Sequence, residues 1–197
     1  INRRIQSEAR ILSDLLEITD PAWQNAVEGY LNTQRFYILV EPQYYQIALE
    51  VYNRIKKEVH TVGLINTSRE QFREPIQPQP DSLAAVVTSE NRWALAYAHF
   101  LLGRVTRCPS VDSLKEHKVA ITADCMLYQN YAVRKISGEV YQTPFIGAKA
   151  YEIQLASRLV ALSQVEADID AAQKNLVRLN MVVQALSACD LDQLTEN

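Results

Sequence analysis

Basic and aromatic side chains are interleaved in the middle of this chain, and they are the residues best suited to bind a ligand. The cations between Gly103 and Ile136 are Arg104, Arg107, Lys115, Lys118, Arg134 and Lys135. The tyrosines among or just after the last of them are Tyr128, Tyr131 and Tyr141. Cations contact phosphate groups and tyrosine rings stack on bases, so the segment is a candidate nucleic-acid surface. The alternative, which we favour for the tyrosines, is that they pack a sheet face or a subunit interface.

Catalytic and metal-binding motifs are missing from the sequence. The five glycines are far apart and form neither a P-loop nor a dinucleotide-binding fingerprint. The three histidines are isolated, and the three cysteines are too widely spaced for a zinc pattern or a disulfide framework. Cys125 and His117 are a weak candidate for a nucleophile and its base, because no third group orients them. The sequence therefore predicts a non-catalytic protein without a cofactor.

Composition narrows the class of protein further. The chain has 197 residues, 48% of them hydrophobic and 22% charged, and a net charge of −3, which does not suggest wholesale nucleic-acid binding. No apolar run approaches the ~20 residues of a membrane span. An odd number of spaced cysteines favours reduced thiols in an intracellular protein. Ile1 is not an initiator residue, so we expect the chain to be a fragment of a larger protein.

The last fifty residues, 148–197, contain no glycine or proline, and apolar residues repeat every seven positions over much of this stretch. The first seam position is occupied by Leu155, Leu162, Ile169, Leu176 and Val183. Three residues further on stand Val165, Ala172, Leu179 and Leu186, and Arg158 interrupts this second column. A heptad stripe of this length predicts a helix that needs a partner helix to cover it.

A shorter stripe opens the chain. Ile1, Ile5, Leu12 and Leu15 keep a 3-4 spacing before Asp20-Pro21, which is a helix-start signal. We therefore predict an N-terminal coiled-coil arm over 1–18, antiparallel to the C-terminal arm over 148–197. A body over 19–147 would lie between the two arms.

The first half of that body, lobe one over 19–73, alternates helix and strand. The sequence predicts a helix from Pro21 to Leu31, a strand over 36–40, a helix over 42–57 and a strand over 62–65. The last three form a βαβ unit, so its two strands are expected to be parallel. Prolines then mark a linker over 74–82.

Lobe two, over 83–147, alternates in the same way and gives a mixed α/β (α+β) body with covering helices. Ser137-Gly138 is a turn signal, which predicts a hairpin of the strands 127–136 and 139–145. The other predicted elements are strands over 83–87, 104–108 and 119–122 and helices over 90–103 and 111–117.

This layout resembles the hinge of an SMC-type ATPase. Residues 101–108 (LLGRVTRC) and 111–116 (VDSLKE) resemble a hinge strand and the helix after it, and 119–128 (VAITADCMLY) resembles a strand that usually ends in glycine. Residues 15–18 and 23–28 are similar to the start of such hinges. Cys125 replaces the expected glycine, and only Gly138 and Gly147 represent a usual glycine-rich stretch. These departures fit divergent relatives of the MukB, Wadjet or Rad50 type.

The resemblance implies a hinge that joins two protomers of an ATPase whose heads lie elsewhere in the parent protein. It implies a homodimer, contacts with DNA and, through absent parts, other SMC-complex subunits, in a cytoplasmic, nucleoid-associated bacterial protein of chromosome segregation or plasmid defence. An edge strand beside Gly138 would pair with the partner subunit. The expected interface residues are Val62, Leu64, Leu127, Val140, Phe145 and Ile146. The expected DNA-binding residues are Arg104, Arg107, Lys115, Lys118, Arg134 and Lys135.

Two other functions remain open at this point. A protein-interaction adaptor would use the long C-terminal helix to pair with a foreign coiled coil. A small α/β enzyme with a helical dimerisation tail would need a ligand pocket lined by polar groups.

Overall fold

The computed structural model describes residues 8–72 and 77–188. The chain divides into two units, Ile1–Ile153 (the body) and Gln154–Asn197. The α-helices are α1 (Gln24–Leu31), α2 (Tyr45–Ile55), α3 (Arg92–Leu102), α4 (Gly138–Tyr141) and α5 (Ala148–Ala188). The strands are β1 (Arg10–Ile11), β2 (Glu17–Ile18), β3 (Ile38–Leu39), β4 (Val87–Thr88), β5 (Thr106–Cys108), β6 (Val119–Thr122), β7 (Met126–Gln129) and β8 (Ala132–Lys135).

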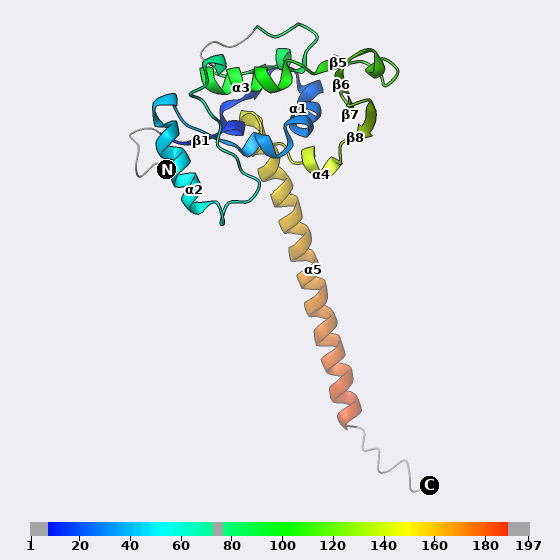
Figure 1. The fold of residues 1–197 in the computed structure, drawn as a ribbon. Coiled ribbons are helices and arrows are strands. Elements are labelled where there is room, and N and C mark those ends of the chain that lie inside the picture. The colour runs from blue at the N-terminus through cyan, green and yellow to red at the C-terminus, as the bar shows by residue number, and fades with distance from the viewer. Residues whose placement is uncertain (1–7, 73–76, 189–197) are drawn as a thin grey trace. The chain divides into compact units, whose positions relative to one another are not determined.

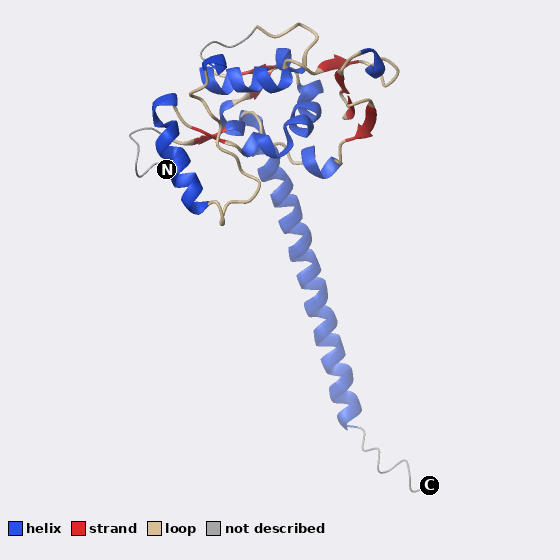
Figure 2. Cartoon of the chain, in the orientation of Figure 1, coloured by secondary structure: helices blue, strands red, loops and turns tan. Residues whose placement is uncertain are grey.

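The body mixes short strands with helices, as Figure 2 shows. β5, β6, β7 and β8 form one sheet in chain order, with β5 and β6 parallel and the other neighbours antiparallel. β1 pairs with β3 and β2 with β4, both antiparallel. The four-stranded sheet lies at one end of the body and β1 with α2 at the other (Figure 1). The predicted mixed α/β class is confirmed.

The predicted βαβ unit of the first lobe is present in reduced form. α2 follows a 3-10 turn at Pro42–Tyr44, as the proline predicts. The strand expected over 36–40 is the two-residue β3. The strand expected over 62–65 is a single parallel bridge between Ile38 and Leu64, in which Ile38 donates to Gly63 and accepts from Ile65 at 2.8 and 2.9 Å. The parallel direction was therefore predictable, whereas the strand length was not.

In the second lobe, the helix predicted over 90–103 is α3, and the strands predicted over 104–108 and 119–122 are β5 and β6. The strand predicted over 83–87 is wrong, because Leu83–Val86 is a 3-10 helix and only β4 after it is a strand. The helix predicted over 111–117 is reduced to a 3-10 turn at Leu114–Glu116.

Asn91 caps α3, because its side chain accepts hydrogen bonds from the N–H groups of Trp93 and Ala94 at 3.1 and 3.0 Å. The hairpin predicted around Ser137-Gly138 is wrong. The turn lies instead at Asn130–Tyr131, between β7 and β8, and Gly138 begins the short helix α4.

The coiled-coil arm predicted over residues 1–18 is also wrong where the structure describes it, at residues 10–18. They form β1, a 3-10 turn at Leu12–Leu15 and β2, not the predicted coiled-coil helix, and residues 1–7 of that arm lie outside the described part. Leu12 and Leu16 are 0% and 1% exposed. Leu15, the other described member of the predicted stripe, is half-buried and packs against the same core. The apolar residues of this segment therefore serve the core of the body and not a helix seam.

Side chains from both predicted lobes pack into one main core. Its largest fully buried members include Leu12, Leu16, Leu31, Leu83, Leu102, Ile121, Leu127 and Ile146. Removing such side chains from water is the main force that holds the body together. The core also reaches Ile146, two residues before α5, so the start of that helix is fixed by the body's own packing.

α5 begins at Ala148, the residue at which the C-terminal arm was predicted to start. It is helical to Ala188, and residues 189–197 lie outside the described part. Every side chain from 155 to 187 is exposed in this chain, and the seam leucines Leu155 and Leu176 are 62% and 60% exposed. Among the described residues, no helix has the length and apolar character needed to cross a bilayer.

Candidate functional site

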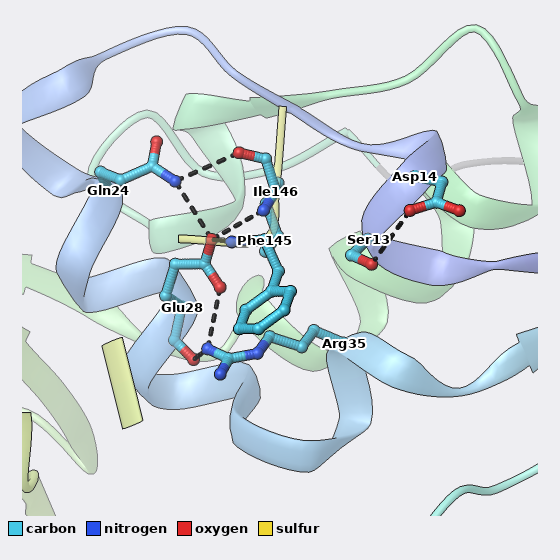
Figure 3. Close-up of polar contacts among 7 residues, drawn as sticks. All are labelled: Ser13, Asp14, Gln24, Glu28, Arg35, Phe145 and Ile146. Atoms are coloured by element: carbon cyan, nitrogen blue, oxygen red, sulfur yellow. Dashed lines mark hydrogen bonds and ion pairs between the residues drawn. The ribbon is translucent and has the colours of Figure 1, made fainter. Parts of the chain in front are cut away.

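A buried carboxylate fixes the segment that leads into α5. Glu28 belongs to α1 and is fully buried. Its Oε1 accepts hydrogen bonds from the backbone N–H groups of Phe145 and Ile146, at 2.6 and 2.7 Å. Gln24, one turn earlier, donates from Nε2 to the carbonyl oxygen of Ile146 at 3.2 Å. Figure 3 shows these contacts, which hold residues 145–146 against α1. We call this set of contacts the clamp.

Arg35 completes the clamp on its other side. Its Nη1 donates to Glu28 Oε2 at 2.8 Å and to the Glu28 carbonyl oxygen at 3.2 Å. The guanidinium lies 4.8 Å from the ring centres of both Phe36 and Phe145. Burial lowers the pKa of Arg35, and the neighbouring Glu28 opposes that shift. Because the pair is withdrawn from water, each charge depends on the other.

The first turn of α5 is held by two further carboxylates. Glu17 accepts hydrogen bonds from the N–H of Ala148 with both carboxylate oxygens, at 3.0 and 3.2 Å. An anion at a helix N-terminus is favourable because the unpaired N–H groups there carry partial positive charge. Gly147 precedes the helix with φ +93°, and a Cβ there would meet Glu17 Oε2 at 2.9 Å. Asp14 accepts from the hydroxyl of Tyr151 at 2.9 Å, which raises the pKa of that tyrosine.

The outer edge of the four-stranded sheet is exposed. β8 pairs with β7 on one side, and no strand of the described residues pairs with its other side. All four of its residues are exposed, including Val133 at 49%. Asn130 and Tyr131 form the turn before it with φ +53° and +62°, the backbone form that tight hairpins favour. An exposed edge strand offers unpaired backbone groups to another chain.

Several solved structures of known proteins resemble this chain in fold. The chain resembles the SMC hinge domain of Pyrococcus furiosus (TM-score 0.52, 17% identity, 68% of this chain and 74% of that one). It also resembles the Smc hinge domain of the same organism with an extended coiled coil (TM-score 0.53, 16% identity, 96% of this chain and 67% of that one). A third similar structure is the asymmetric dimer of the Geobacillus stearothermophilus SMC hinge domain (TM-score 0.51, 17% identity, 91% of this chain and 73% of that one).

The fold is that of an SMC hinge domain. No family model and no curated protein matches the sequence, so the likeness lies in the fold.

Cys125, at the position where the hinge resemblance expects glycine, has φ +69°. This left-handed backbone is the conformation that glycine adopts without strain. The thiol is fully buried, and burial raises its pKa to about 11. The cysteine thus retains the backbone conformation typical of glycine and adds a protonated, unreactive side chain to the hinge core.

The structure divides the residues predicted for the hinge dimer interface into two groups. Leu127 and Ile146 are 1% and 2% exposed, so the prediction is wrong for these two side chains as surface contacts. The sequence places Leu127 at the start of one predicted strand and Ile146 just after another, and no local pattern shows that the core covers both side chains. The half-buried residues, which remain candidates, are Val62, Leu64, Val140 and Phe145.

Among the predicted DNA-binding residues, Arg107 has a structural role. It donates from Nε and Nη2 to the carbonyl oxygens of Ser82 and Pro80, at 3.1 and 2.7 Å, and lies 5.3 Å from the centre of the Trp23 ring. The exposed cations are Arg104, Lys115, Lys118, Arg134 and Lys135. Arg104 and Arg134 line one groove, and Lys115 and Lys118 line a separate hollow together with Tyr128 and Tyr131.

Other candidate chemistry is not assembled in the described residues. No group of three or more histidine, cysteine or acidic side chains there is arranged to hold a metal ion. Cys108 and Cys125 are free and buried, and Cys189 lies outside the described part. The thiol of Cys125 donates to the carbonyl oxygen of Ala123 at 4.0 Å, and no hydrogen bond to His117 is found among the described residues. The high pKa of that thiol also disfavours the thiolate that a nucleophile requires.

Glu28 and Arg35 are functional candidates that sequence reasoning missed. A glutamate in the middle of a helix ordinarily reads as a solvated residue. Its buried neighbours Ala26, Val27 and Gly29 were the available hint that this helix is covered on most sides. Its contacts with Phe145 and Ile146 span more than a hundred residues, and no local spacing encodes them.

Proposed function

We propose that this chain is the hinge, or dimerisation, domain of an SMC-like ATPase. The observation that carries the proposal is the hinge fold of the body combined with the exposed heptad seam of α5. A hinge joins two coiled-coil arms, and the clamp supplies the rigid start that such an arm needs. Catalysis would reside in other parts of the parent protein. We infer a cytoplasmic, nucleoid-associated role in chromosome maintenance or plasmid defence, with further subunits bound elsewhere on the parent.

Two sheet edges support a homodimer with twofold symmetry. β8 is one exposed edge, and residues 62–65, which pair with Ile38 on one side, form the other. If β8 of one copy pairs with 62–65 of its partner, symmetry repeats the contact and both edges are satisfied. The half-buried Val62, Leu64, Val140 and Phe145, together with the exposed Val133, supply apolar area for the contact.

Light scattering on the purified chain tests this assembly. Wild type should show twice the 22.4 kDa chain mass at tens of micromolar, and Val133→Lys should shift the mass toward the monomer. Val111→Lys is the matched control, because Val111 is 46% exposed, close to the 49% of Val133, but lies outside the sheets. A wild-type monomer at that concentration, or equal loss of the dimer in both variants, would contradict the proposed interface.

We further propose that the exposed cations contact DNA phosphates without reading sequence. Arg134 and Lys135 are adjacent on β8 and both exposed. Duplex binding, followed by fluorescence anisotropy, should weaken about tenfold or more after Arg134→Glu with Lys135→Glu, and should fall steeply with salt. The double variant Lys56→Glu with Lys57→Glu carries the same charge change at the exposed end of α2 and should have a smaller effect. Equal losses would point to net charge alone.

The adaptor function has one observation in its favour, the exposure of the seam over residues 155–186. An adaptor would associate through α5, whereas a hinge associates through the body. Leu176→Lys with Val183→Lys separates the two in the same light-scattering experiment. If this pair produces the monomer while Val133→Lys leaves the dimer intact, the adaptor function is favoured over the hinge.

A further inference from the structure

A polar groove lies in the body, between the end of α1 and the sheet formed by β7 and β8. Its volume is about 300 Å³. The polar side chains that line it include Asn32, Thr33, Gln34, Arg104, Gln129 and Arg134. Two of these are cations and none is a carboxylate. The composition of the lining therefore favours an anion.

The position of Arg134 follows from strand register. In β7 and β8, Leu127 lies opposite Arg134 and Gln129 lies opposite Ala132. Residues directly opposite, and residues two apart on one strand, share a sheet face. Arg134 and Gln129 therefore project from the face that the groove borders. Arg104 comes to the groove from a different element, because it directly follows Gly103, the C-cap of α3.

Both guanidinium groups are available to a ligand. Arg104 and Arg134 are exposed, and within the described residues neither side chain has a hydrogen bond or an ion pair. Arg107 shows the contrast, since backbone carbonyls and the Trp23 ring already occupy its guanidinium. An arginine that no carboxylate neutralises can present its planar set of N–H donors to an oxyanion.

The helix end beside the groove opposes an anion only weakly. α1 ends at Leu31, and the terminal carbonyl groups of a helix carry about half an elementary negative charge. Two guanidinium charges exceed that. The side-chain amides of Asn32, Gln34 and Gln129 and the hydroxyl of Thr33 add neutral donors. A groove of about 300 Å³ has room for a phosphate group and part of its hydration shell.

We propose that this groove is a phosphate-binding site in which Arg104 and Arg134 clasp the phosphate oxygens and the polar side chains of residues 32–34 and 129 complete the contacts. Phosphate is favoured over carboxylate because paired guanidinium groups can surround its several oxygens from two directions. The site rests on the groove itself and requires neither the hinge role nor the dimer. The phosphate group belongs either to a free small molecule or to a nucleic-acid backbone, and both present the same chemistry.

NMR titration of the ¹⁵N-labelled chain with sodium pyrophosphate, in a phosphate-free buffer at constant ionic strength, tests the site. Saturable shifts are expected at the backbone amides of residues 32–34 and at Gln129 and Arg134. Arg104→Gln with Arg134→Gln should weaken binding about tenfold or more, because two charge-assisted contacts are lost. Lys56→Gln with Lys57→Gln, which removes the same charge elsewhere, should leave it within about twofold.

Shifts that are scattered over surface lysines, fail to saturate, or are reproduced by sodium chloride would overturn the proposal. Unchanged affinity in the double arginine variant would do the same. Arg104→Lys with Arg134→Lys keeps the charge and guards against misfolding, and it should still weaken binding because lysine lacks the paired donors. Duplex DNA added to the pyrophosphate complex then identifies the source: competition assigns the site to a nucleic-acid backbone, and its absence assigns it to a small phosphorylated molecule.

Discussion

Apolar side chains are mostly buried in the body but exposed on the helix from Gln154 onward. Leu102 in the body is fully buried, whereas Leu176 in α5 is 60% exposed. The body buries its apolar residues against other residues of the same chain, whereas the helix exposes an apolar seam with a coiled-coil repeat. The difference indicates that the body supplies its own stability, while the helix depends on another helix to cover its seam.

The body and α5 each contain an ion pair, and the two pairs differ in their exposure to water in the same way. Arg35 and Glu28 approach to 2.8 Å with side chains 6% and 0% exposed, while Lys174 and Asp170 approach to 2.6 Å on α5 with 76% and 61% exposed. The distances are nearly equal, but water screens the second pair and is excluded from the first. Breaking a buried pair leaves an uncompensated charge, whereas an exposed helical pair contributes little.

Removing one partner of the buried pair should give the largest effect. We expect Glu28→Ala to lower the free energy of unfolding of the body by about 3–5 kcal/mol, because Arg35 and two backbone N–H groups lose their partner. Urea unfolding can be followed by the fluorescence of Trp23 and Trp93, which both pack against the core. Asp170→Ala is the matched control and should change stability by less than about 0.5 kcal/mol.

The double variant Glu28→Met with Arg35→Met sharpens that test. Replacing both charges with apolar side chains removes the uncompensated charge, so it should be less destabilising than Glu28→Ala. Loss of stability below about 1 kcal/mol in Glu28→Ala would show that the clamp does not hold the body together.

A matched pair of leucine truncations should give the next effect. Leu102→Ala removes a fully buried side chain and should cost the body about 2–5 kcal/mol. Leu176→Ala removes an exposed one and should leave the unfolding of the body within about 0.5 kcal/mol of wild type. Circular dichroism at several protein concentrations would report any association through the seam separately. If Leu176→Ala destabilises the body as much as Leu102→Ala, the two units are not independent.

The sequence was most informative where local signals act alone. Proline after Asp20 and after Glu41 marked helix starts that the structure contains, and the absence of glycine and proline marked the full run of α5 to Ala188. These signals concern backbone geometry within a few residues. A heptad repeat likewise needs no knowledge of the rest of the chain.

Features that depend on tertiary contacts were not predictable in this way. The turn at Asn130–Tyr131 has two residues with positive φ but no glycine, so the nearby Ser137-Gly138 gave a stronger and misleading signal. Leu12 and Leu15 fit a helical spacing, yet they belong to a 3-10 turn, from which Leu12 enters the core and Leu15 packs against it. The clamp joins Glu28 to Phe145, and the groove joins residues 30–37 to β8, across distances in sequence that no pattern spans.

The smallest expected difference concerns the buried thiol of Cys125. Burial raises its pKa from 9.0 to about 11. The unfolded chain therefore releases the thiol proton above pH 9 while the folded body retains it. The free energy of unfolding should thus be fully maintained below pH 9 and should fall by about 1 kcal/mol between pH 9 and 10 from this group.

Cys125→Ala isolates that contribution, because alanine cannot titrate. Its stability at pH 8 should differ from wild type through packing, but it should lack the thiol's part of the decline between pH 9 and 10. Burial also raises the pKa of Tyr97 to about 12, and this affects both proteins alike and mainly above pH 10. Urea unfolding at pH 8, 9 and 10 measures the two slopes. Equal slopes would mean that the thiol is accessible to solvent and that the turn at Cys125 opens in solution, which would weaken the contrast between a closed body and an exposed helix.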